Sequence, residues 1–382
     1  MTDDKDLVYE NSKWQQKGAG RMKTERLIMA ALAMLAGIML TASSAWAGDL
    51  TPPGAPGPTM HTLTEIYDAV DGLQQQVTDL QQELNTIKQR QAVSGFAETV
   101  GGMVLIPAGP FRMGDAFMEG GADELPVHTV TVSAFYMDQY PVTKALWDEV
   151  RDWADFEGLG YTDLPEAEGK GFSHPVHTVS WFAAVQWANA RSERDGLTPV
   201  YYTTAAFNTV YKTGTGMPHA NWSANGYRLP TEAEWEKAAR GGVDGRRFPW
   251  ADGNTIAHTR ANYYANPSIP DYDVSATANG HPDYSVGATP YTSPVGSFAP
   301  NGYGLFDMAG NVQQWCWDWY SSTYYETSPD TDPRGPASGS SRVKRGGRWD
   351  VFADSCRVAN RFSDSPGNER DSLGFRLVRA AQ

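Results

Sequence analysis

Cysteine and histidine are scarce in this chain. The 382 residues include two cysteines and seven scattered histidines, and no Cys/His cluster has the spacing of a zinc site. His174 and His177 stand three residues apart before a predicted helix, but neither has an evident third ligand. We therefore predict structural histidines. The chain also lacks an internal repeat and a glycine loop of the phosphate-binding kind.

Basic residues are too few to balance the acidic ones. Lys and Arg total 31 against 45 Asp and Glu, so the formal net charge is −14. Nucleic acid and anionic lipid need a basic footprint, which this composition does not supply. We predict no nucleic-acid partner. The charge is compatible with cation binding and with a soluble exported protein.

A hydrophobic run long enough to span a membrane is also missing. The apolar stretch at 27–40 is preceded by Lys23 and Arg26, and Ala45-Trp46-Ala47 follows as a small-x-small site. This pattern predicts a signal peptide over 1–47, with Met22 as a possible true start and an uncleaved anchor as the alternative. We expect an exported protein, periplasmic or secreted, with no stable membrane span after cleavage.

The region after the signal peptide has its own organisation. Residues 48–60 form a Pro/Gly linker, and 92–100 a second short link. Between them, apolar residues alternate by three and four over 61–91: Leu63, Ile66, Val70, Leu73, Val77, Leu80, Leu84 and Ile87. This spacing predicts a coiled coil that makes a homo-oligomer, either dimer or trimer. The alternative is one amphipathic helix packed on its own domain.

Residues 101–382 form the main predicted domain, which composition suggests is mixed α and β and rich in loops. Two strands and a turn are expected over 103–114, and alternating residues continue over 128–143. Helices are expected after the N-caps Thr143 and Ser180, the second ending at Gly196. A third should follow the capping box of Thr231 and Glu234 and end near Gly241.

Several motifs follow one another between about 101 and 380. They are MVLIPAGPFRMG at 103–114, PVT at 141–143, HPV-x-x-VSW at 174–181, RLPTEAEWE at 228–236, FPW at 248–250, PNGYGLFDMAGN at 300–311 and RGG…GFR at 345–376. Their order resembles the formylglycine-generating enzyme family, also called the sulfatase-modifying factor family. The resemblance implies an α+β, loop-rich fold of the C-type-lectin-like kind, preceded here by the coiled-coil helix.

The resemblance also implies a copper(I) site, because enzymes of this family hold the ion between two cysteines five residues apart. In this chain the second position is Cys356, but the first is Val351, and the family's serine after the Gly pair is Arg348. Copper is therefore not expected. Three interpretations of Cys356 stay open: a disulfide with Cys316, a small buried side chain, or a relic half-site.

Calcium is the cofactor that the resemblance favours, bound weakly by oxygen ligands. One family site corresponds to Asp307, Gly310, Val312 and Gln314, the last usually a glutamate. The other begins at Asn262 and Tyr263, with Asp283 as the expected acidic partner. The alternative is that Asp307 and Asn311 only form turn hydrogen bonds.

The loop over 348–371 mixes aromatic and charged side chains, which is typical of recognition surfaces on rigid scaffolds. The predicted ligand-binding residues are Arg348, Trp349, Asp350, Phe352, Asp354, Phe362 and Asp364. We expect a non-catalytic domain that binds an unknown protein or small molecule. The alternatives are an oxidoreductase of the sulfatase-maturing type with an altered site, a structural envelope protein, and a solvated loop without a partner.

Overall fold

The computed structural model describes residues 99–268 and 270–381. The predicted signal peptide, Pro/Gly linker and coiled coil lie outside these residues, so those predictions stay as they are. Among the described residues, no helix is long and apolar enough to cross a membrane. The first described strand, β1 (Thr99–Val100), lies within the segment predicted as a link and pairs with the next strand.

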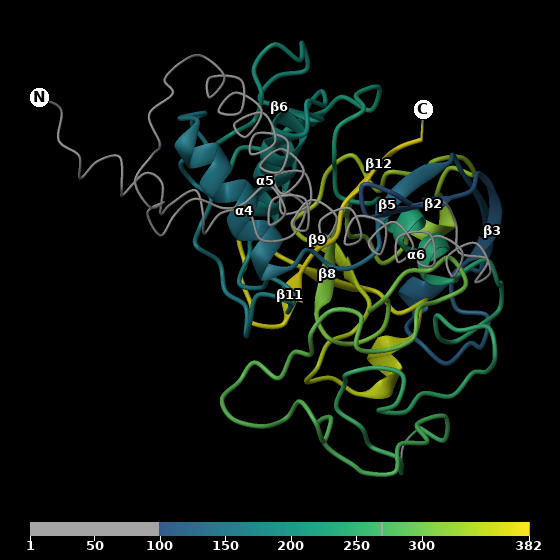
Figure 1. Ribbon diagram of the computed structural model, residues 1–382. Coiled ribbons are helices and arrows are strands. Elements are labelled where there is room, and N and C mark those ends of the chain that lie inside the picture. Colours follow the sequence, from purple (N-terminus) through teal and green to yellow (C-terminus); the bar gives the residue numbers. More distant parts are fainter. Residues whose placement is uncertain (1–98, 269, 382) are drawn as a thin grey trace, which may run out of the picture. The chain divides into compact units, whose positions relative to one another are not determined.

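Two four-stranded sheets organise the domain (Figure 1). In the first, β1 lies beside β2 (Met103–Ile106), β5 (Phe135–Asp138) and β12 (Val378–Ala380), and all neighbours are antiparallel. The last strand thus completes a sheet begun by the first, which ties the two ends of the domain together.

The second sheet carries the segments that the family motifs single out. Its order is β10 (Phe362–Asp364), β9 (Arg342–Arg345), β8 (Gln313–Trp319) and β11 (Leu373–Gly374). Strand β11 runs parallel to β8, whereas the other pairs are antiparallel. The Gly-Gly break follows β9, so the sheet presents the C-terminal loop from one of its strand ends.

Two hairpins and short helices complete the domain. Strand β3 (Gly109–Met113) pairs with β4 (His128–Val132), and β6 (Tyr201–Tyr202) pairs with β7 (His219–Ala220). Single 3-10 turns are η1 (Ala122–Glu124), η2 (Tyr324–Glu326) and η3 (Ala353–Cys356). Much of the remaining chain is loop, as the composition predicts.

The three predicted helices are present, and their caps are as expected. They are α4 (Lys144–Phe156), α5 (Trp181–Arg194) and α6 (Glu232–Ala239), capped by Thr143, Ser180 and the Thr231–Glu234 capping box. Figure 1 shows α4 and α5 together on one side of β8 and β9, with α6 on the other. Gly196 and Gly241 adopt the left-handed φ expected just beyond the C-caps of α5 and α6.

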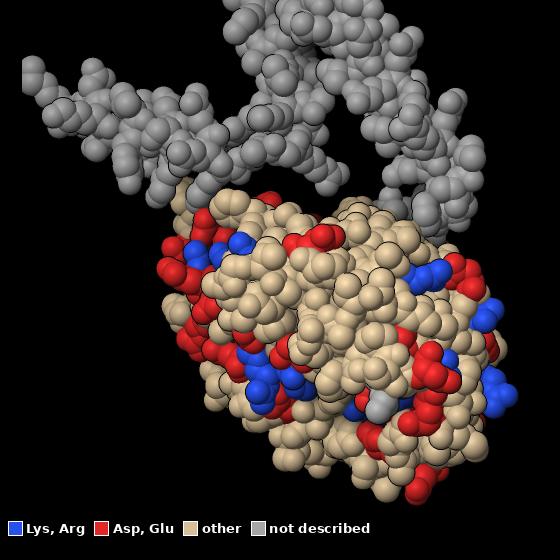
Figure 2. Space-filling view, turned by 90° about the horizontal axis from the view of Figure 1, so that it is seen from below, with Lys and Arg blue, Asp and Glu red and all other residues tan. Residues whose placement is uncertain are grey.

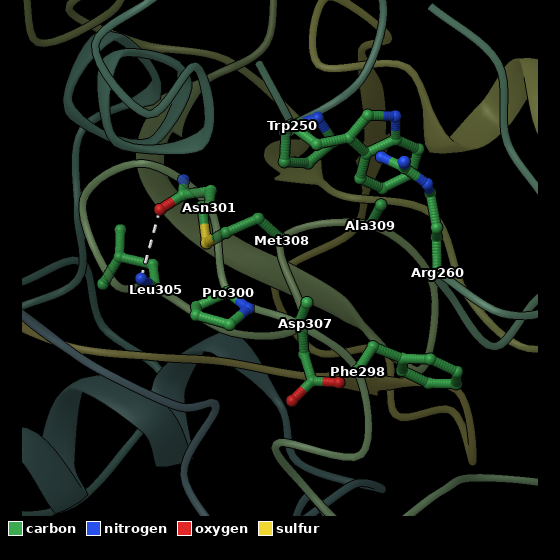
Figure 3. Close-up of a pocket in the computed structure, with 11 residues that line it drawn as sticks. Trp250, Arg260, Phe298, Pro300, Asn301, Leu305, Asp307, Met308 and Ala309 are labelled. Carbon is green, nitrogen blue, oxygen red and sulfur yellow. Dashed lines mark hydrogen bonds between the residues drawn. The ribbon is translucent and has the colours of Figure 1, made fainter. Parts of the chain in front are cut away.

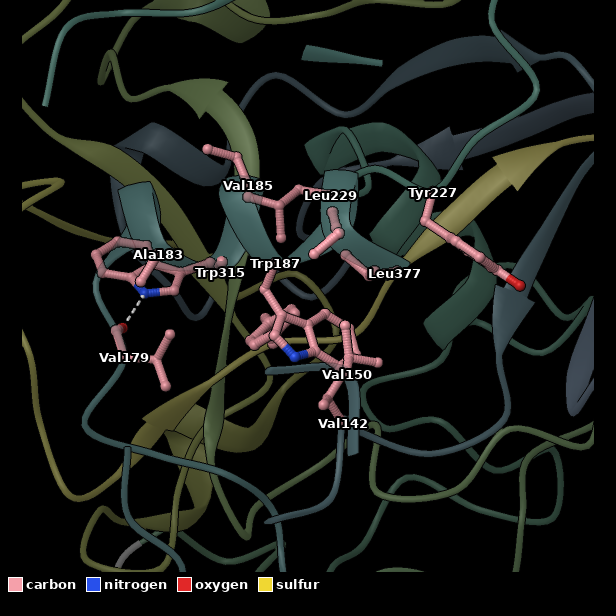
Figure 4. Close-up of a cluster of buried hydrophobic side chains, with 14 of the residues drawn as sticks. Val142, Val150, Val179, Ala183, Val185, Trp187, Tyr227, Leu229, Trp315 and Leu377 are labelled. Carbon is pink, nitrogen blue, oxygen red and sulfur yellow. Dashed lines mark hydrogen bonds between the residues drawn. The ribbon is translucent and has the colours of Figure 1, made fainter. Parts of the chain in front are cut away.

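The largest core cluster packs against α4 and α5 (Figure 4). Trp147 and Trp187 stack with ring centroids 5.6 Å apart, and Phe375 meets both rings edge-on. Each indole N–H finds a carbonyl: Trp147 donates to Pro165 and Trp187 donates to Trp147, both at 3.1 Å. Aromatic burial with satisfied N–H groups explains why the Trp-rich sequence folds around these positions.

A buried ion-pair network joins α6 to the second sheet. Arg345 at the end of β9 contacts Glu232 at 2.9 Å and Glu236 at 2.5 Å, and all three side chains are almost fully buried. Arg361 also donates to Glu232 at 2.7 Å. Although desolvation opposes the charged form, Arg240 and Arg345 hold the pKa of the Glu236 carboxyl below its ordinary value. The network connects segments more than 100 residues apart.

Candidate ligand-binding loop and metal positions

The Gly-Gly break places the chain directly over Cys356. Gly346 and Gly347 have φ values of 99° and 73°, which glycine adopts without strain. A Cβ on Gly347 would lie 2.6 Å from the Cys356 sulfur, so no larger residue fits there. The first residues of the loop therefore cover the Cys356 thiol.

Cys356 closes the turn η3 and is fully buried in a small core cluster with Tyr263 and Ala353. Burial raises the pKa of its thiol far above the ordinary value, and the charge of Asp354 adds to the shift. The thiolate is the form that binds metals and acts as a nucleophile. At neutral pH this residue is thus a protonated, enclosed thiol.

The predicted disulfide between Cys316 and Cys356 is wrong. Both cysteines are free and buried. Cys316 lies on β8 in the core cluster that contains α6, whereas Cys356 belongs to the separate cluster under the C-terminal loop. Of the three interpretations of Cys356, the small buried side chain agrees with the structure.

Val351 stands where the family resemblance implies the other copper cysteine. Its backbone carbonyl accepts a hydrogen bond from the N–H of Tyr264 at 2.9 Å. Arg348, in place of the family's serine, contacts Asp350 at 2.8 Å and donates to the Ser372 hydroxyl at 3.3 Å. The chain thus fills this position with an aliphatic side chain and an ion pair.

The predicted ligand-binding residues divide into exposed and structural ones. Phe352 is 47% exposed and meets Tyr264, 37% exposed, edge-on with ring centroids 5.5 Å apart. Asp350 and Asp354 are exposed nearby in sequence. Trp349, in contrast, is buried and packs edge-on against Tyr291. The loop therefore offers an aromatic pair together with exposed carboxylates.

Asp364 is a brace and not a free contact residue, which corrects its predicted role. Its carboxylate lies 3.0 Å from Lys344 Nζ and 2.7 Å from Arg370 Nε. Desolvation opposes its charge, but hydrogen bonds from Arg370, Lys344 and Asn368 hold the pKa of this carboxyl far below its ordinary value. Phe362, on the same strand β10, is half-buried. Because β10 pairs with β9, both positions belong to the scaffold of the sheet. The sequence did not reveal this pairing.

The predicted calcium ligands around Asp307 fit a cation only in part. The Asp307 carboxylate is buried, and one oxygen accepts from the Gly296 N–H while the other has no hydrogen-bond partner among the described residues. Burial raises the pKa of this carboxyl. The side chain of Gln314, however, already has partners. Its amide oxygen accepts from Trp235 and Arg376, and its amide nitrogen donates to the backbone carbonyl of Asp307. Gln314 is thus not a free ligand.

Asp307 also lines a small pocket of about 20 Å³, the size of one water molecule (Figure 3). Its carboxylate is directed away from Trp250 and Arg260, which pair on the opposite side of the view. Gly310 and Val312 follow Asp307 in the same buried turn. A Cβ on Gly310 would lie 2.3 Å from the Asn262 carbonyl oxygen, so the two predicted calcium sites adjoin.

Asn262 fits the other predicted calcium site, but Asp283 does not. Asn262 is buried, its amide donates to the Tyr291 carbonyl at 2.7 Å, and its side-chain oxygen has no partner. Asp283 is exposed, and its N–H donates to His281. The buried acid of this loop is Asp273, which accepts from the Tyr263 hydroxyl at 2.6 Å. Because this loop is longer than the family pattern, sequence spacing does not identify Asp273.

The histidines before α5 are held by neighbouring hydroxyls. His174 lies 2.9 Å from the Thr292 hydroxyl, and His177 lies 3.0 Å from that of Thr178. Burial lowers the pKa of both rings. Within 99–268 and 270–381, no group of three or more His, Cys, Asp or Glu residues could hold a metal ion. Any cation would therefore need amide and carbonyl oxygens in addition to a single carboxylate such as that of Asp307.

Sequence reasoning missed Tyr264, the exposed partner of Phe352. The signal was present in the RANYY segment, where two adjacent tyrosines cannot both face the core in an extended chain. Figure 2 shows one face of the domain, with acidic side chains in separate groups and basic ones beside several of them. On this face of the described residues no broad basic patch is present.

Comparison with known proteins identifies the family. The Sulfatase-modifying factor enzyme 1-like domain matches residues 89–381. The formylglycine-generating enzyme of Streptomyces coelicolor is 38% identical over 309 residues, covering 73% of this chain and 90% of the relative. That of Mus musculus is 34% identical over 293 residues, covering 72% and 74%.

Solved structures give the same fold. Treponema denticola variable protein 1 matches with a TM-score of 0.56 and 30% identity, covering 74% of this chain and 98% of its own. The crystal structure of CarF matches with a TM-score of 0.53 and 28% identity, covering 73% and 98%. The predicted α+β, loop-rich fold is confirmed, and the chain belongs to the sulfatase-modifying factor family, whose relatives include formylglycine-generating enzymes.

Proposed function

We propose that this chain is a non-catalytic binding protein that uses its C-terminal loop. The observation that carries the proposal is the state of the copper position: Val351 replaces one thiol, and the remaining Cys356 is buried and protonated. Copper(I) binding between two thiolates needs both sulfurs. The exposed Tyr264–Phe352 pair beside Asp350 and Asp354 supplies the contact surface instead.

The alternative is an oxidoreductase of the formylglycine-generating type. Relatives that bear this name are up to 38% identical over most of the domain, which favours the alternative. The structural neighbour from Treponema denticola is named a variable protein, so the domain also occurs under a name that states no such activity.

The deciding experiment incubates copper-treated protein with oxygen and a Cys-x-Pro-x-Arg peptide. Mass spectrometry should show no aldehyde, while the Streptomyces coelicolor enzyme assayed in parallel should convert the peptide. Val351→Cys serves as a second test, because it restores the missing sulfur but leaves Arg348 in place. Turnover by the unmodified chain would establish the oxidoreductase and reject the binding role.

The binding domain is, in this proposal, exported and multivalent. Cleavage after Ala47 leaves residues 61–91 as an oligomerising segment, so several loops act on one ligand surface. N-terminal sequencing of mature protein and light scattering with and without 61–91 test this. A mature chain that begins at Met1 or Met22, or a monomer in both samples, contradicts it.

Calcium remains part of the proposal as a weakly held structural ion. The unpartnered buried oxygens of Asn262 and Asp307 support it, since hard cations take such ligands. Gln314 contributes no free oxygen, which agrees with weak binding. The ion would hold the turn that carries Gly310 against the loop that carries Asn262.

A further inference from the structure

A large cleft lies outside the C-terminal loop. Its volume is about 860 Å³, within the range of about 300–1,000 Å³ that is typical of ligand sites. The connection between β3 and β4 forms its wall. The turn that follows α6, together with the 3-10 turn η2, completes the cleft. None of its lining residues belongs to 348–371, so it is distinct from the surface proposed above.

The wall of the cleft is held in place before any ligand arrives. The carboxylate of Asp115 accepts three backbone N–H bonds, from Phe117 at 2.9 Å and from Glu119 and Gly120 at 2.8 Å each. Glu124, in η1, is held by two hydrogen bonds from Arg357 at 2.7 and 2.8 Å. A wall fixed in this way loses little conformational entropy on binding.

Met118 stands out on this wall. It is 80% exposed, and its φ of 56° is one that side-chain-bearing residues seldom adopt. The bonds that Asp115 makes to its neighbours impose that backbone, and so present a long, adaptable apolar side chain at the cleft. A strained, exposed apolar residue on a braced loop points to a contact function.

The charges around the cleft are mostly negative. Asp244 and Glu326 are exposed on its border, and Arg112 is the basic residue among those that line it, whereas the buried carboxylate of Asp115 is paired with Arg357 at 3.6 Å. Leu125, Pro126 and Val127 provide apolar lining. An apolar surface bordered by carboxylates is complementary to an apolar ligand that bears a positive charge.

We propose that this cleft binds a short peptide segment in which a lysine or arginine is flanked by apolar side chains. The apolar flanks lie against Met118 and the 125–127 strip, and the cation lies between Asp244 and Glu326. The cleft is open and at the upper end of the volume range for small ligands, which suits a peptide.

The test uses the full chain and two peptides that carry fluorescein on the N-terminal amine, Leu-Phe-Lys-Leu-Leu-amide and the same peptide with Glu in place of Lys. Fluorescence anisotropy should show binding of the Lys peptide at protein concentrations up to about 1 mM, and weaker binding of the Glu peptide. In protein labelled with methyl-13C methionine, the Lys peptide should shift the signal that disappears in Met118→Ala. That signal places the peptide at the cleft.

A pair of variants separates charge from bulk. Ala122 is exposed on the cleft, so Ala122→Arg and Ala122→Glu both add an extended side chain, with opposite charge. Ala122→Arg should weaken Lys-peptide binding by roughly tenfold, whereas Ala122→Glu should keep or improve it. Asp244→Asn and Glu326→Gln should each weaken it by roughly two- to fivefold, and the exposed Glu166→Gln should change nothing.

Three results would overturn the proposal: no Lys-peptide binding at about 1 mM, equal binding of both peptides, or equal effects of the two Ala122 variants. Phe352→Ala distinguishes this site from the C-terminal loop. Unchanged peptide binding in that variant supports the cleft, while lost binding assigns the peptide to the loop and rejects the cleft.

Discussion

Two arginines three residues apart show how differently one fold uses the same side chain. Arg345 is fully buried between Glu232 and Glu236, and it also donates to the carbonyls of Val358 and Ala359. Arg348, just past the Gly-Gly break, is partly exposed and pairs with Asp350, its neighbour in sequence. The first arginine joins distant segments, while the second pairs within the loop and reaches the Ser372 hydroxyl just beyond it.

This contrast explains why the fold should tolerate substitution of Arg348 better than substitution of Arg345. The buried network needs every partner, because a buried charge without one is costly. The loop pair is solvated, so its loss costs little. Gly346 and Gly347 stand between these two arginines, whereas Arg361, farther along the loop, returns to the buried network through Glu232.

Removing Arg345 from the buried ion-pair network should give the largest effect on the free energy of unfolding. Arg345→Met leaves Glu232 and Glu236 with fewer cations and removes the donors to two carbonyls, so we expect a loss of about 3–5 kcal/mol in unfolding free energy. Urea denaturation measures it. The matched Arg348→Met should cost about 1 kcal/mol or less. Similar losses in both variants would contradict the comparison.

Asp364, toward the other end of the loop, allows a second test of how much a buried ion pair stabilises the fold. Asp364→Asn leaves the nearly buried Lys344 with a weaker acceptor, so we expect a loss of about 1–3 kcal/mol at pH 7.

The pH dependence gives a sharper test of Asp364. Because the folded-state pKa of Asp364 is depressed, its contribution is present above the unfolded value, about 3.9, and is lost as pH falls through the folded value. The stability difference between wild type and Asp364→Asn should thus shrink as the pH falls below about 4. Denaturation at several acidic pH values measures it, and a constant difference would contradict the brace.

Calcium should have a smaller effect. At a free concentration ten times its Kd, binding stabilises by about 1.4 kcal/mol, which corresponds to a rise of about 2–4 °C in Tm. Asn262→Ala should abolish the rise by removing a buried ligand oxygen. Thermal scans with calcium and with chelator check this, and identical Tm values would show that Asn262 and Asp307 only order turns.

The smallest effect is expected on the exposed surface. Phe352→Ala should change stability by about 0.5 kcal/mol or less, because the side chain is almost half exposed. The fully buried Phe375→Ala should cost about 3–5 kcal/mol. Comparable losses in urea denaturation would mean that Phe352 supports the core.

The scaffold could be predicted from the sequence because its signals are local or repeated across the family. Thr143, Ser180 and Thr231 cap their helices as expected, since capping depends on residues within one turn. The family resemblance then supplied the α+β, loop-rich fold class, whereas the order of the strands came from the structure. The site was less predictable: Asp283 is exposed, Asp273 is the buried acid, and spacing along a long loop carries no such information.

The sequence by itself determined the family motifs and the helix caps, and it places Val351 where the resemblance implies a copper cysteine, because each depends only on which residue stands at which position. Only the tertiary structure decided that the two cysteines lie in different core clusters, that Asp364 braces β9 and that Tyr264 joins Phe352 at the surface. Those facts depend on contacts between residues 20 or more positions apart along the chain. Pairing over such separations depends on packing in three dimensions, which no local pattern records.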